Sequence, residues 1–299
     1  MRHLYTFSLI EAVARSGSMR KAAEDMNLTA SALNRRIRRF EEEFGTELFE
    51  RLPGGVRLNP AGELLLQHYR LTQSDLVKVQ GQVADLTGER RGHVRIACSQ
   101  ALLPYFLPQQ IARYRAEHPG VTFTVNVRDR TQAEEELATY ASDLALVFEP
   151  VYLVDFEVIQ HVPQRVHVLM AADHPLAHKP ELRLRDCLDR PHVAPNARYG
   201  VRHLLDFAAR RVGRQLNPVV ETESFELIRH YVLHEHALGF QIPIGLDASA
   251  DSRLVHRPLA IRDLQPGSLI LGQMRGRTLP VASAKFALQV SAALSTAEA

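Results

Sequence analysis

The chain has few of the features that mark membrane proteins or disulfide-stabilised proteins. None of the apolar runs in its 299 residues approaches the roughly 18 residues that a transmembrane helix needs. The segment from Met1 to Phe7 contains no long apolar stretch and no small-residue cleavage site like that of a signal peptide. Two cysteines, Cys98 and Cys187, provide neither a disulfide framework nor a CxxC zinc site. We therefore expect a cytoplasmic protein with no membrane contact, no metal and no cofactor.

The chain as a whole also lacks a large excess of positive or negative charge, but its charged residues are unevenly distributed along the sequence. The net charge is +2 and charged residues make up 23% of the chain, as in an average soluble globular protein. That balance alone does not point to a nucleic acid. The segment Thr29–Phe40, however, contains four arginines and no acidic residue, and Glu41, Glu42 and Glu43 follow at once. The average therefore hides a basic patch.

Residues 1–58 have the pattern of three short helices followed by a hairpin. The spacing of apolar residues predicts a first helix, and Ser16-Gly17-Ser18 interrupts it before a second helix begins. Thr29 is placed to cap a third helix, and Gly45 is placed to end it in the left-handed conformation. Apolar residues then alternate around Pro53-Gly54-Gly55, which predicts a hairpin. Three helices and a hairpin describe a winged helix-turn-helix domain.

The third helix is expected to present a polar, basic face to solvent. The candidate base-reading residues on this face are Ala30, Ser31, Asn34, Arg35 and Arg38. A helix of this kind fits the major groove of duplex DNA, where Arg can bind guanine and Asn can bind adenine. In the hairpin, Arg51 and Arg57 are candidates for phosphate contacts. The arginines could instead merely solvate a helix face, but the turn, the hairpin and the long helix that follows favour DNA binding.

A single long helix is predicted over residues 59–90, as a linker between two domains. Asn59 is placed as its cap and Pro60 as its first residue. Apolar residues alternate four and three apart along it, as in a coiled-coil seam, at Leu65, Tyr69, Thr72, Leu76, Val79, Val83 and Leu86. Either the chain's own domain or the same helix of a second copy could cover this stripe. We favour a dimer, because so long a helix between two domains needs a cover for its apolar side.

From His93 onward, predicted strands alternate with predicted helices. The strands include Val94–Cys98, Val121–Val127 and Asp143–Phe148, and a helix is expected at Gln132–Tyr140. Similar strand and helix units recur around Arg165–Met170, Val201–Val212 and Phe225–His234. This alternation predicts an α/β domain over residues 91–299 with a largely parallel sheet. Its length predicts two lobes, the first from about residues 91–161 and 267–299 and the second from about residues 162–266.

At four stretches the sequence resembles the LysR-type transcriptional regulators. The stretches are Ser16–Ala23, Thr29–Ile37 with the following Arg39-Phe40-Glu41, Gly45–Arg51, and Val56–Gly62. The order of domains also agrees, so the resemblance covers the whole chain. It implies a winged domain that reads an inverted repeat in promoter DNA as a homodimer or homotetramer. It also implies an effector domain similar to periplasmic binding proteins, which holds a small molecule between its lobes. RNA polymerase is left open as a further partner.

Two positions of the third helix depart from the pattern of that family. Ala30 stands where the family usually has a polar residue, often Gln, and Asn34 stands where it usually has Ser. Ala30 cannot donate a hydrogen bond to a base, although its methyl group can touch thymine. The resemblance therefore implies DNA binding, but it does not carry over the operator sequence.

The candidate effector residues lie where predicted helices begin after strands. Ser99 and Gln100 follow the first strand of the α/β region, at a position that often contacts the inducer in the resembled family. Thr131 is expected to open the next helix in the same way. Further candidates are Arg198 and Tyr199 in the second lobe and Phe148 at a strand end. Exposed amides at helix starts attract carboxylates and phosphates, which predicts an acidic effector. Simple capping would, however, use the same residues.

Other functions are less favoured. His230, His234 and His236 lie near a helix end but lack the internal glutamate of an H-E-x-x-H zinc site. Cys98 and Cys187 could form a redox switch, as in the peroxide-sensing members of the resembled family, but Cys98 is expected in a core strand. An enzyme tethered to a DNA-binding domain would need a nucleophile and a base, and G-x-S-x-G, P-loop and G-x-G-x-x-G motifs are all missing. A transport protein would need a signal peptide. We therefore expect a regulator and not an enzyme.

Overall fold

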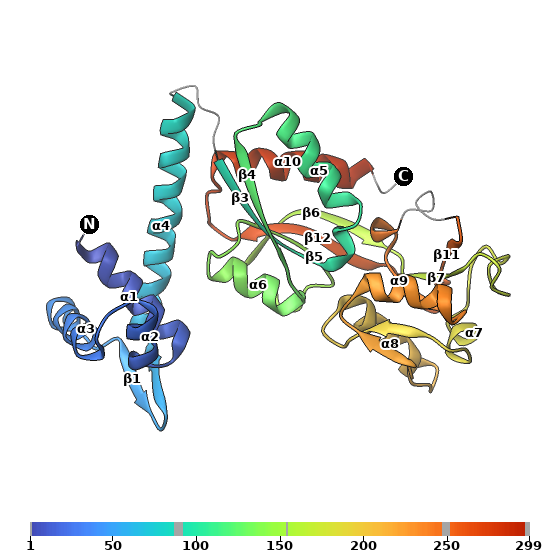
Figure 1. The fold of residues 1–299 in the computed structure, drawn as a ribbon, viewed down its shortest axis with the longest axis horizontal. Helices are drawn as coiled ribbons and strands as arrows, with labels where there is room; N and C mark the ends of the chain where they lie inside the picture. The colour runs from blue at the N-terminus through green and yellow to red at the C-terminus, as the bar shows by residue number, and fades with distance from the viewer. Residues whose placement is uncertain (1, 87–91, 154, 247–251, 297–299) are drawn as a thin grey trace. The chain divides into compact units, whose positions relative to one another are not determined.

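The computed structural model describes residues 2–86, 92–153, 155–246 and 252–296. The chain forms two compact units, Met1–Val77 and Lys78–Ala299, and the division between them falls inside helix α4 (Pro60–Leu86). Figure 1 shows the elements of both units. None of the helices in the described ranges is long and apolar enough to cross a membrane.

The first unit is helical apart from one hairpin. Its elements before α4 are α1 (Arg2–Ser16), α2 (Met19–Asp25), α3 (Ala30–Phe44), β1 (Phe49–Leu52) and β2 (Gly55–Leu58). The two strands pair antiparallel and form the wing, with Phe49 opposite Leu58 and Leu52 opposite Gly55. The short helices, the wing and the long fourth helix confirm the predicted winged helix-turn-helix.

Side-chain caps and one glycine determine where these helices begin and end. The hydroxyl oxygens of Ser18 and Thr29 accept hydrogen bonds from backbone N–H groups in the first turns of α2 and α3, at 3.4 and 3.2 Å. Helix α3 ends at Gly45, whose φ of 85° lies in the left-handed region. Asn59 accepts a backbone hydrogen bond at 2.9 Å before α4, and Pro60 is the first residue of that helix. The caps thus agree with those predicted for Thr29, Gly45 and Asn59.

A hydrophobic core joins the short helices, the wing and the start of α4. Its buried residues include Leu9, Leu33, Ile37, Leu48 and Leu65. Gly62 in the first turn of α4 lies against the chain that leads into the wing, because a Cβ atom at this position would be 2.3 Å from the Leu48 carbonyl oxygen. The long helix therefore starts in direct contact with the wing.

The second unit has two lobes with separate sheets. The first lobe contains β3 (Gly92–Cys98), η1 (Gln100–Leu102), α5 (Phe106–Glu117), β4 (Val121–Val127), α6 (Arg130–Ala138), β5 (Leu144–Phe148), β6 (Phe156–Gln164), β12 (Gly267–Met274) and α10 (Val281–Thr296). The second lobe contains β7 (His167–Ala171), α7 (Leu184–Leu188), β8 (Val193–Pro195), α8 (Gly200–Arg211), β9 (Val220–Thr222), α9 (Phe225–His234), β10 (Gly239–Gln241), η2 (Pro243–Gly245) and β11 (Leu254–Pro258). In Figure 1, α5 and α10 cover one face of the larger sheet and α6 covers the other.

The sheets are mixed, and the prediction of a largely parallel sheet is wrong. The larger sheet has the order β4-β3-β5-β12-β6; β3 pairs parallel with β4 and β5, but β12 pairs antiparallel with β5 and β6. In the second lobe β10-β7-β11 is antiparallel and β8-β9 is parallel. The chain leaves the first lobe along β6 and returns along β12. The whole second lobe separates β12 in the chain from its neighbours β5 and β6. Its local residue pattern therefore does not reveal whether it runs parallel or antiparallel to them.

In each lobe, the carboxyl ends of parallel strands meet at one edge. Cys98 at the end of β3 lies opposite Val127 of β4 and Leu146 of β5. In the second lobe, β8 and β9 end side by side at Pro195 and Thr222. Edges of this kind are where α/β folds usually bind ligands, because the segments that follow the strands converge there.

Candidate DNA interface and effector site

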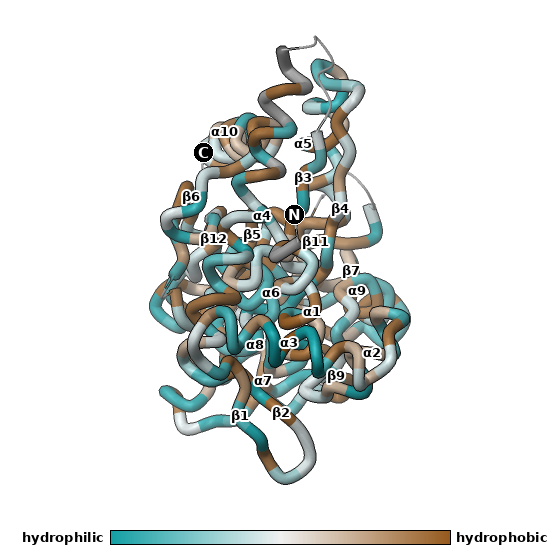
Figure 2. The backbone as a smooth tube through the Cα atoms, turned by 90° about the vertical axis from the view of Figure 1, so that its left-hand side faces the viewer, coloured by the Kyte–Doolittle hydropathy of each residue, from teal (hydrophilic) through white to brown (hydrophobic). Residues whose placement is uncertain are grey.

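The candidate DNA interface is a groove between α3 and the wing of the first unit. The residues Ala30, Ser31, Asn34 and Arg38 of α3 line one wall, and Arg51 of the wing lines another. All of these side chains are exposed except Asn34, which is partly buried. In Figure 2, α3 is drawn mainly in the hydrophilic colour. The groove thus brings together most of the predicted DNA-contact residues.

Two of the predicted DNA-contact residues, Arg35 and Arg57, do not line this groove. Arg35 is exposed on the adjacent face of α3, outside the walls of the groove. Arg57 pairs with Glu50 across the hairpin at 2.5 Å, and this hydrogen bond raises the pKa of the guanidinium. No ion pair joins Arg35, Arg38 or Arg51 to a carboxylate of the residues that the structure describes. These three cations are therefore free to meet a polyanion, whereas Arg57 would first have to leave Glu50.

The start of α2 also lines the groove, which the sequence prediction missed. Ser18, Met19 and Arg20 all contribute to its wall. They are held there because the carbonyl oxygen of Gly17 accepts a hydrogen bond from the N–H of Val56 in the wing, at 2.9 Å. The interruption Ser16-Gly17-Ser18 was the available signal, since it turns the start of a helix, with its free N–H groups, toward the wing.

The first half of the predicted dimerisation stripe is buried within its own unit. Leu65 and Tyr69 are 8% and 5% exposed. The ring of Tyr69 lies 5.3 Å from that of Phe7 in α1, and Arg70 pairs with Glu11 of α1 at 2.8 Å. This part of α4 therefore belongs to the core of the winged unit.

The second half of the stripe is uncovered in the single chain. Leu76, Val79 and Val83 are 43%, 50% and 54% exposed. They are spaced three and four residues apart, so they lie on one side of the helix. Leu86 is the last residue of α4, and its side chain lies outside the described part of the chain. The coiled-coil prediction therefore depends on these three exposed residues.

The candidate effector site lies where the carboxyl edges of the two lobes face each other. Gln100 of the first lobe accepts a hydrogen bond at Oε1 from the N–H of Phe225, the first residue of α9, at 2.5 Å. Arg198, just before α8, holds its guanidinium 4.0 Å from the carboxylate of Asp129, just before α6. The Arg198 side chain is nevertheless 67% exposed. Two polar contacts thus join the lobes at the predicted positions.

Ser99 and Tyr199 lie next to these contacts and do not cap the helices that follow them. The Ser99 residue is 9% exposed, and its side chain makes no cap hydrogen bond to η1. Tyr199 likewise makes no cap bond to α8, and its ring meets that of Phe225 edge-on at 5.5 Å. Burial raises the pKa of Tyr199, so its hydroxyl stays protonated at neutral pH. Capping therefore does not explain these two hydroxyl groups.

The prediction that Thr131 opens a helix is wrong. Helix α6 begins at Arg130, and Asp129 is its N-cap. The carboxylate of Asp129 accepts from the backbone N–H of Gln132 at 2.9 Å, and the Gln132 side chain accepts from the Asp129 N–H at 3.3 Å. This capping box already places a negative group at the helix start, and a reciprocal Asp–Gln pair outcompetes a single threonine hydroxyl. Thr131 is exposed in the first turn.

Phe148 lies in the core rather than at an open surface. It is 3% exposed and belongs to the main hydrophobic cluster of the second unit. A Cβ atom at Gly267 would lie 2.4 Å from its ring, and one at Gly200 would lie 2.5 Å from its carbonyl oxygen. The glycines therefore let β12 and the start of α8 close over Phe148, which leaves little of its surface for a ligand.

The cysteine and histidine side chains are in surroundings that do not favour redox or metal chemistry. Burial raises the pKa of both Cys98 and Cys187 to about 12, so both remain thiols, which are poor nucleophiles. His230 lies 2.9 Å from a Glu226 oxygen and His236 lies 3.5 Å from an Asp173 oxygen. Across the described ranges, no three His, Cys, Asp or Glu side chains gather closely enough to hold a metal ion.

Two family profiles match the chain, one for each unit. Residues 2–63 match the profile "Bacterial regulatory helix-turn-helix protein, lysR family", and residues 87–295 match "LysR substrate binding domain". Among curated proteins, the RuBisCO operon transcriptional regulator of Allochromatium vinosum is 30% identical over 69% of this chain and 67% of its own length. The transcriptional activator CmpR of Synechocystis is 26% identical over 88% of this chain and 84% of its own length.

Solved structures share the fold over nearly the whole chain. A full-length OxyR variant of Pseudomonas aeruginosa has a TM-score of 0.70 at 18% identity and covers 96% of this chain and 94% of its own. CbnR in complex with its target DNA has a TM-score of 0.59 at 15% identity and covers 96% of this chain and 98% of its own. At such identities the likeness concerns the fold alone.

Proposed function

The chain belongs to the LysR family of transcriptional regulators, and on that premise we propose how it reads DNA and how a small molecule controls it. It is a DNA-binding regulator with an effector-binding domain, and not an enzyme. We assign residues 1–58 to DNA binding, residues 59–90 to a dimerising linker helix and residues 91–299 to the effector domain. The DNA-bound form is a homodimer or a pair of dimers that reads an inverted repeat, since a two-fold symmetric protein matches a two-fold symmetric site.

The observation that supports this DNA-binding mode most strongly is the groove between α3 and the wing. Asn34 and the unpaired Arg38 line it from α3, and the unpaired Arg51 lines it from the wing. Helix α3 would enter the major groove with Asn34 and Arg38 at base edges, while Arg51 neutralises a phosphate. Arg35, on the adjacent face of α3, would reach the flank of the same site.

Arg38→Ala is expected to weaken operator binding by about 1–3 kcal/mol and to relax sequence preference at one base pair. The reason is that arginine can hold guanine by two hydrogen bonds in the major groove. Affinities for an operator selected from a random duplex library, and for unrelated DNA, would be measured by fluorescence anisotropy at one salt concentration. Arg51→Ala should instead weaken binding to both duplexes alike. It should also reduce the steepness of log affinity against log salt concentration by about 1.

Arg39→Ala is the matched control for this experiment. Arg39 belongs to the same helix, pairs with Glu43 at 3.0 Å and does not line the groove. It should therefore change the ratio of specific to non-specific affinity much less than Arg38→Ala does. Equal effects of the two substitutions would contradict the proposed docking of α3.

The effector is proposed to be a small acidic molecule bound where the two lobes face each other. Ser99 offers a hydroxyl that is not used in capping, and Arg198 offers a largely exposed guanidinium with one long contact to Asp129. A carboxylate of the ligand would pair with Arg198 and take the place of Gln100 at the N–H of Phe225. Thr131 is left out of this site, because Asp129 already caps its helix. A ligand that binds differently to two arrangements of the lobes shifts the balance between them, and thereby the DNA response.

Ser99→Ala combined with Arg198→Gln is expected to weaken binding of the acidic effector tenfold or more, because a charge-assisted hydrogen bond is lost. The effector would first be found by a thermal-shift screen of small carboxylates, and its affinity for each variant would be measured by calorimetry. Thr131→Val should leave both the affinity and the DNA response unchanged. An effector that binds the double variant as well as the parent, or that depends on Thr131, would contradict this site.

A further inference from the structure

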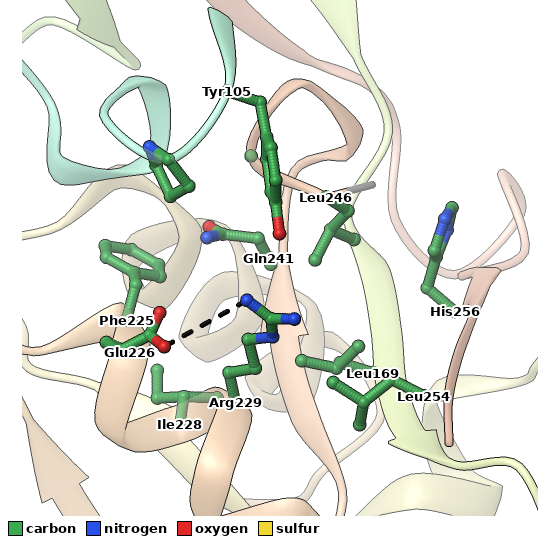
Figure 3. Close-up of a pocket in the computed structure, with 12 residues that line it drawn as sticks. Tyr105, Leu169, Phe225, Glu226, Ile228, Arg229, Gln241, Leu246, Leu254 and His256 are labelled. Carbon is green, nitrogen blue, oxygen red and sulfur yellow. Dashed lines mark ion pairs between the residues drawn. The ribbon is translucent and has the colours of Figure 1, made fainter. Parts of the chain in front are cut away.

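Two hollows in the described part of the chain differ greatly in size. The crevice around Tyr105 and Arg229 of the second unit, drawn in Figure 3, has room for only about 40 Å³, which suits a few water molecules. The groove between α3 and the wing has room for about 1470 Å³. This groove is large enough to receive the phosphate backbone of a duplex.

The position of the wing across this groove determines which part of the DNA it meets. Arg38 lines the groove from α3, and Arg51 and Leu52 line it from the wing. One phosphate backbone separates the major groove of a duplex from the minor groove beside it. If α3 occupies the major groove and this backbone lies between α3 and the wing, the end of the wing reaches the minor groove.

The end of the wing is a stiff turn without a charged residue, formed by Leu52-Pro53-Gly54-Gly55. Figure 1 shows the hairpin extending beyond the short helices of its unit. Leu52 is 43% exposed, and Pro53 is exposed as well. Pro53 fixes its own φ, and Gly54 has a φ of 105°, which suits the third residue of a type II turn. The turn therefore holds the apolar side chain of Leu52 toward solvent with little freedom of the backbone.

Gly55 leaves Leu52 without a cross-strand side chain to pack against. The two residues are opposite each other in the hairpin. A Cβ atom at Gly55 would lie 2.4 Å from the Gly17 carbonyl oxygen, so a larger residue would push the wing away from the turn between α1 and α2. The N–H of Val56 donates to the same oxygen at 2.9 Å. The contact that anchors the wing thus also keeps Leu52 uncovered on that side.

We propose that Leu52 is a wedge that enters the minor groove of the operator and partly unstacks one base step, an inference that rests on the proposed docking of α3. Leucine is one of the apolar side chains that proteins insert between base steps from the minor groove, which kinks the duplex. Arg51, next to the wedge, neutralises a phosphate beside the opened step. Glu50 is the one acidic residue in the sequence of the two wing strands, and it is paired with Arg57 at 2.5 Å.

The wedge gives the protein a sequence preference that no hydrogen bond to a base supplies. Pyrimidine–purine steps such as TA and CA are the easiest to unstack and kink, whereas A-tracts are stiff. Leu52 therefore selects operators that have a flexible step where the wing lies. The preference lies outside the bases that α3 reads.

The test uses the full chain and an operator selected from a random duplex library. Each base step that flanks the bases read by α3 is changed in turn to TA or to AA, and affinity is measured by fluorescence anisotropy. The parent should prefer TA at one step about fivefold or more. Energy transfer between dyes on the two ends of the duplex should report a bend of about 20° or more. Leu52→Ala should abolish the step preference and reduce the bend, while Leu52→Met, which keeps a side chain able to form a wedge, should retain both.

Leu64→Ala is the matched control, because Leu64 is 70% exposed on α4 of the same unit and does not line the groove. It should keep the step preference and the bend of the parent. The wedge is overturned if the parent shows no preference for TA at any flanking step, or if Leu52→Ala keeps both the preference and the bend. Failure of the wedge would leave the difference between Arg38→Ala and Arg39→Ala intact, whereas failure of the proposed docking of α3 would remove that difference.

Discussion

Asp143→Ala is expected to lower the free energy of unfolding by about 3–5 kcal/mol, because it leaves a buried arginine without its anion. The Asp143 carboxylate is fully buried and accepts hydrogen bonds from the guanidinium groups of Arg95, at 2.8 Å, and Arg277, at 2.5 Å. It also accepts from the Ser283 hydroxyl of α10 at 3.1 Å. One carboxylate, directly before β5, thus ties together β3, the chain after β12 and the C-terminal helix.

Urea unfolding of the full chain, followed by circular dichroism, would measure this loss against a surface pair. Asp189 pairs with Arg214, but their side chains are 64% and 48% exposed. Asp189→Ala should therefore cost less than about 1 kcal/mol. If the two substitutions cost the same, the buried cluster does not stabilise the first lobe as we infer.

The same cluster predicts how stability depends on pH. Burial alone would raise the pKa of Asp143, but hydrogen bonds and charge from Arg95 and the charge of Arg277 hold it below its usual value. A carboxyl whose pKa is lower in the folded state contributes its full stabilisation above the unfolded value, near 3.9, and loses it as the pH falls through the folded value. Acid should therefore destabilise the parent more steeply than the Asp143→Ala variant below about pH 4.

Local signals in the sequence were sufficient for most helix boundaries and for the winged domain. Thr29 caps the start of α3 and Gly45 ends it, and each contacts only backbone groups a few positions away. Their roles could therefore be predicted from the neighbouring sequence. The helix predicted over Gln132–Tyr140 is α6, Arg130–Ala138, in the structure, which is within two residues at each end. The failure at Thr131 was also local, because the stronger cap, Asp129, stands only two residues earlier.

Long-range contacts could not be predicted in this way. Gln100 and Phe225 are 125 residues apart in the chain, and Asp143 and Arg277 are 134 apart. Their pairing depends on how the strands are ordered, and periodicity does not encode that order.

The stripe on α4 illustrates the limit of a periodic pattern. Heptad spacing indicates which residues share a side of a helix, but not what covers them. Leu65 and Tyr69 are buried within their own unit, while Leu76 and Val83, in the same stripe, are exposed. One continuous pattern thus serves two purposes, and only the exposed half is available to a second copy.

Leu76→Asp combined with Val83→Asp is therefore expected to separate the subunits and to reduce operator affinity by about 10²–10⁴-fold. Each aspartate would place a charge in an apolar seam, where it has no partner and repels its counterpart on the second helix. A single winged domain then loses the high effective concentration that its tethered partner supplies. Light scattering should report the mass of one 33.6 kDa chain instead of a multiple of it.

Leu64→Asp combined with Gln67→Asp provides the matched control, because both side chains are exposed on α4 and neither position lies three or four residues from Leu76, Val79 or Val83. This control adds the same charge to the same helix, so general effects of charge on DNA affinity are equal in the two proteins. It should keep the parent mass and bind the operator within a few-fold of the parent. If the Leu76 and Val83 variant also keeps the parent mass, the exposed half of the stripe is not the dimer interface. If it becomes monomeric yet binds the operator as tightly as the control, pairing through α4 is not what DNA recognition requires.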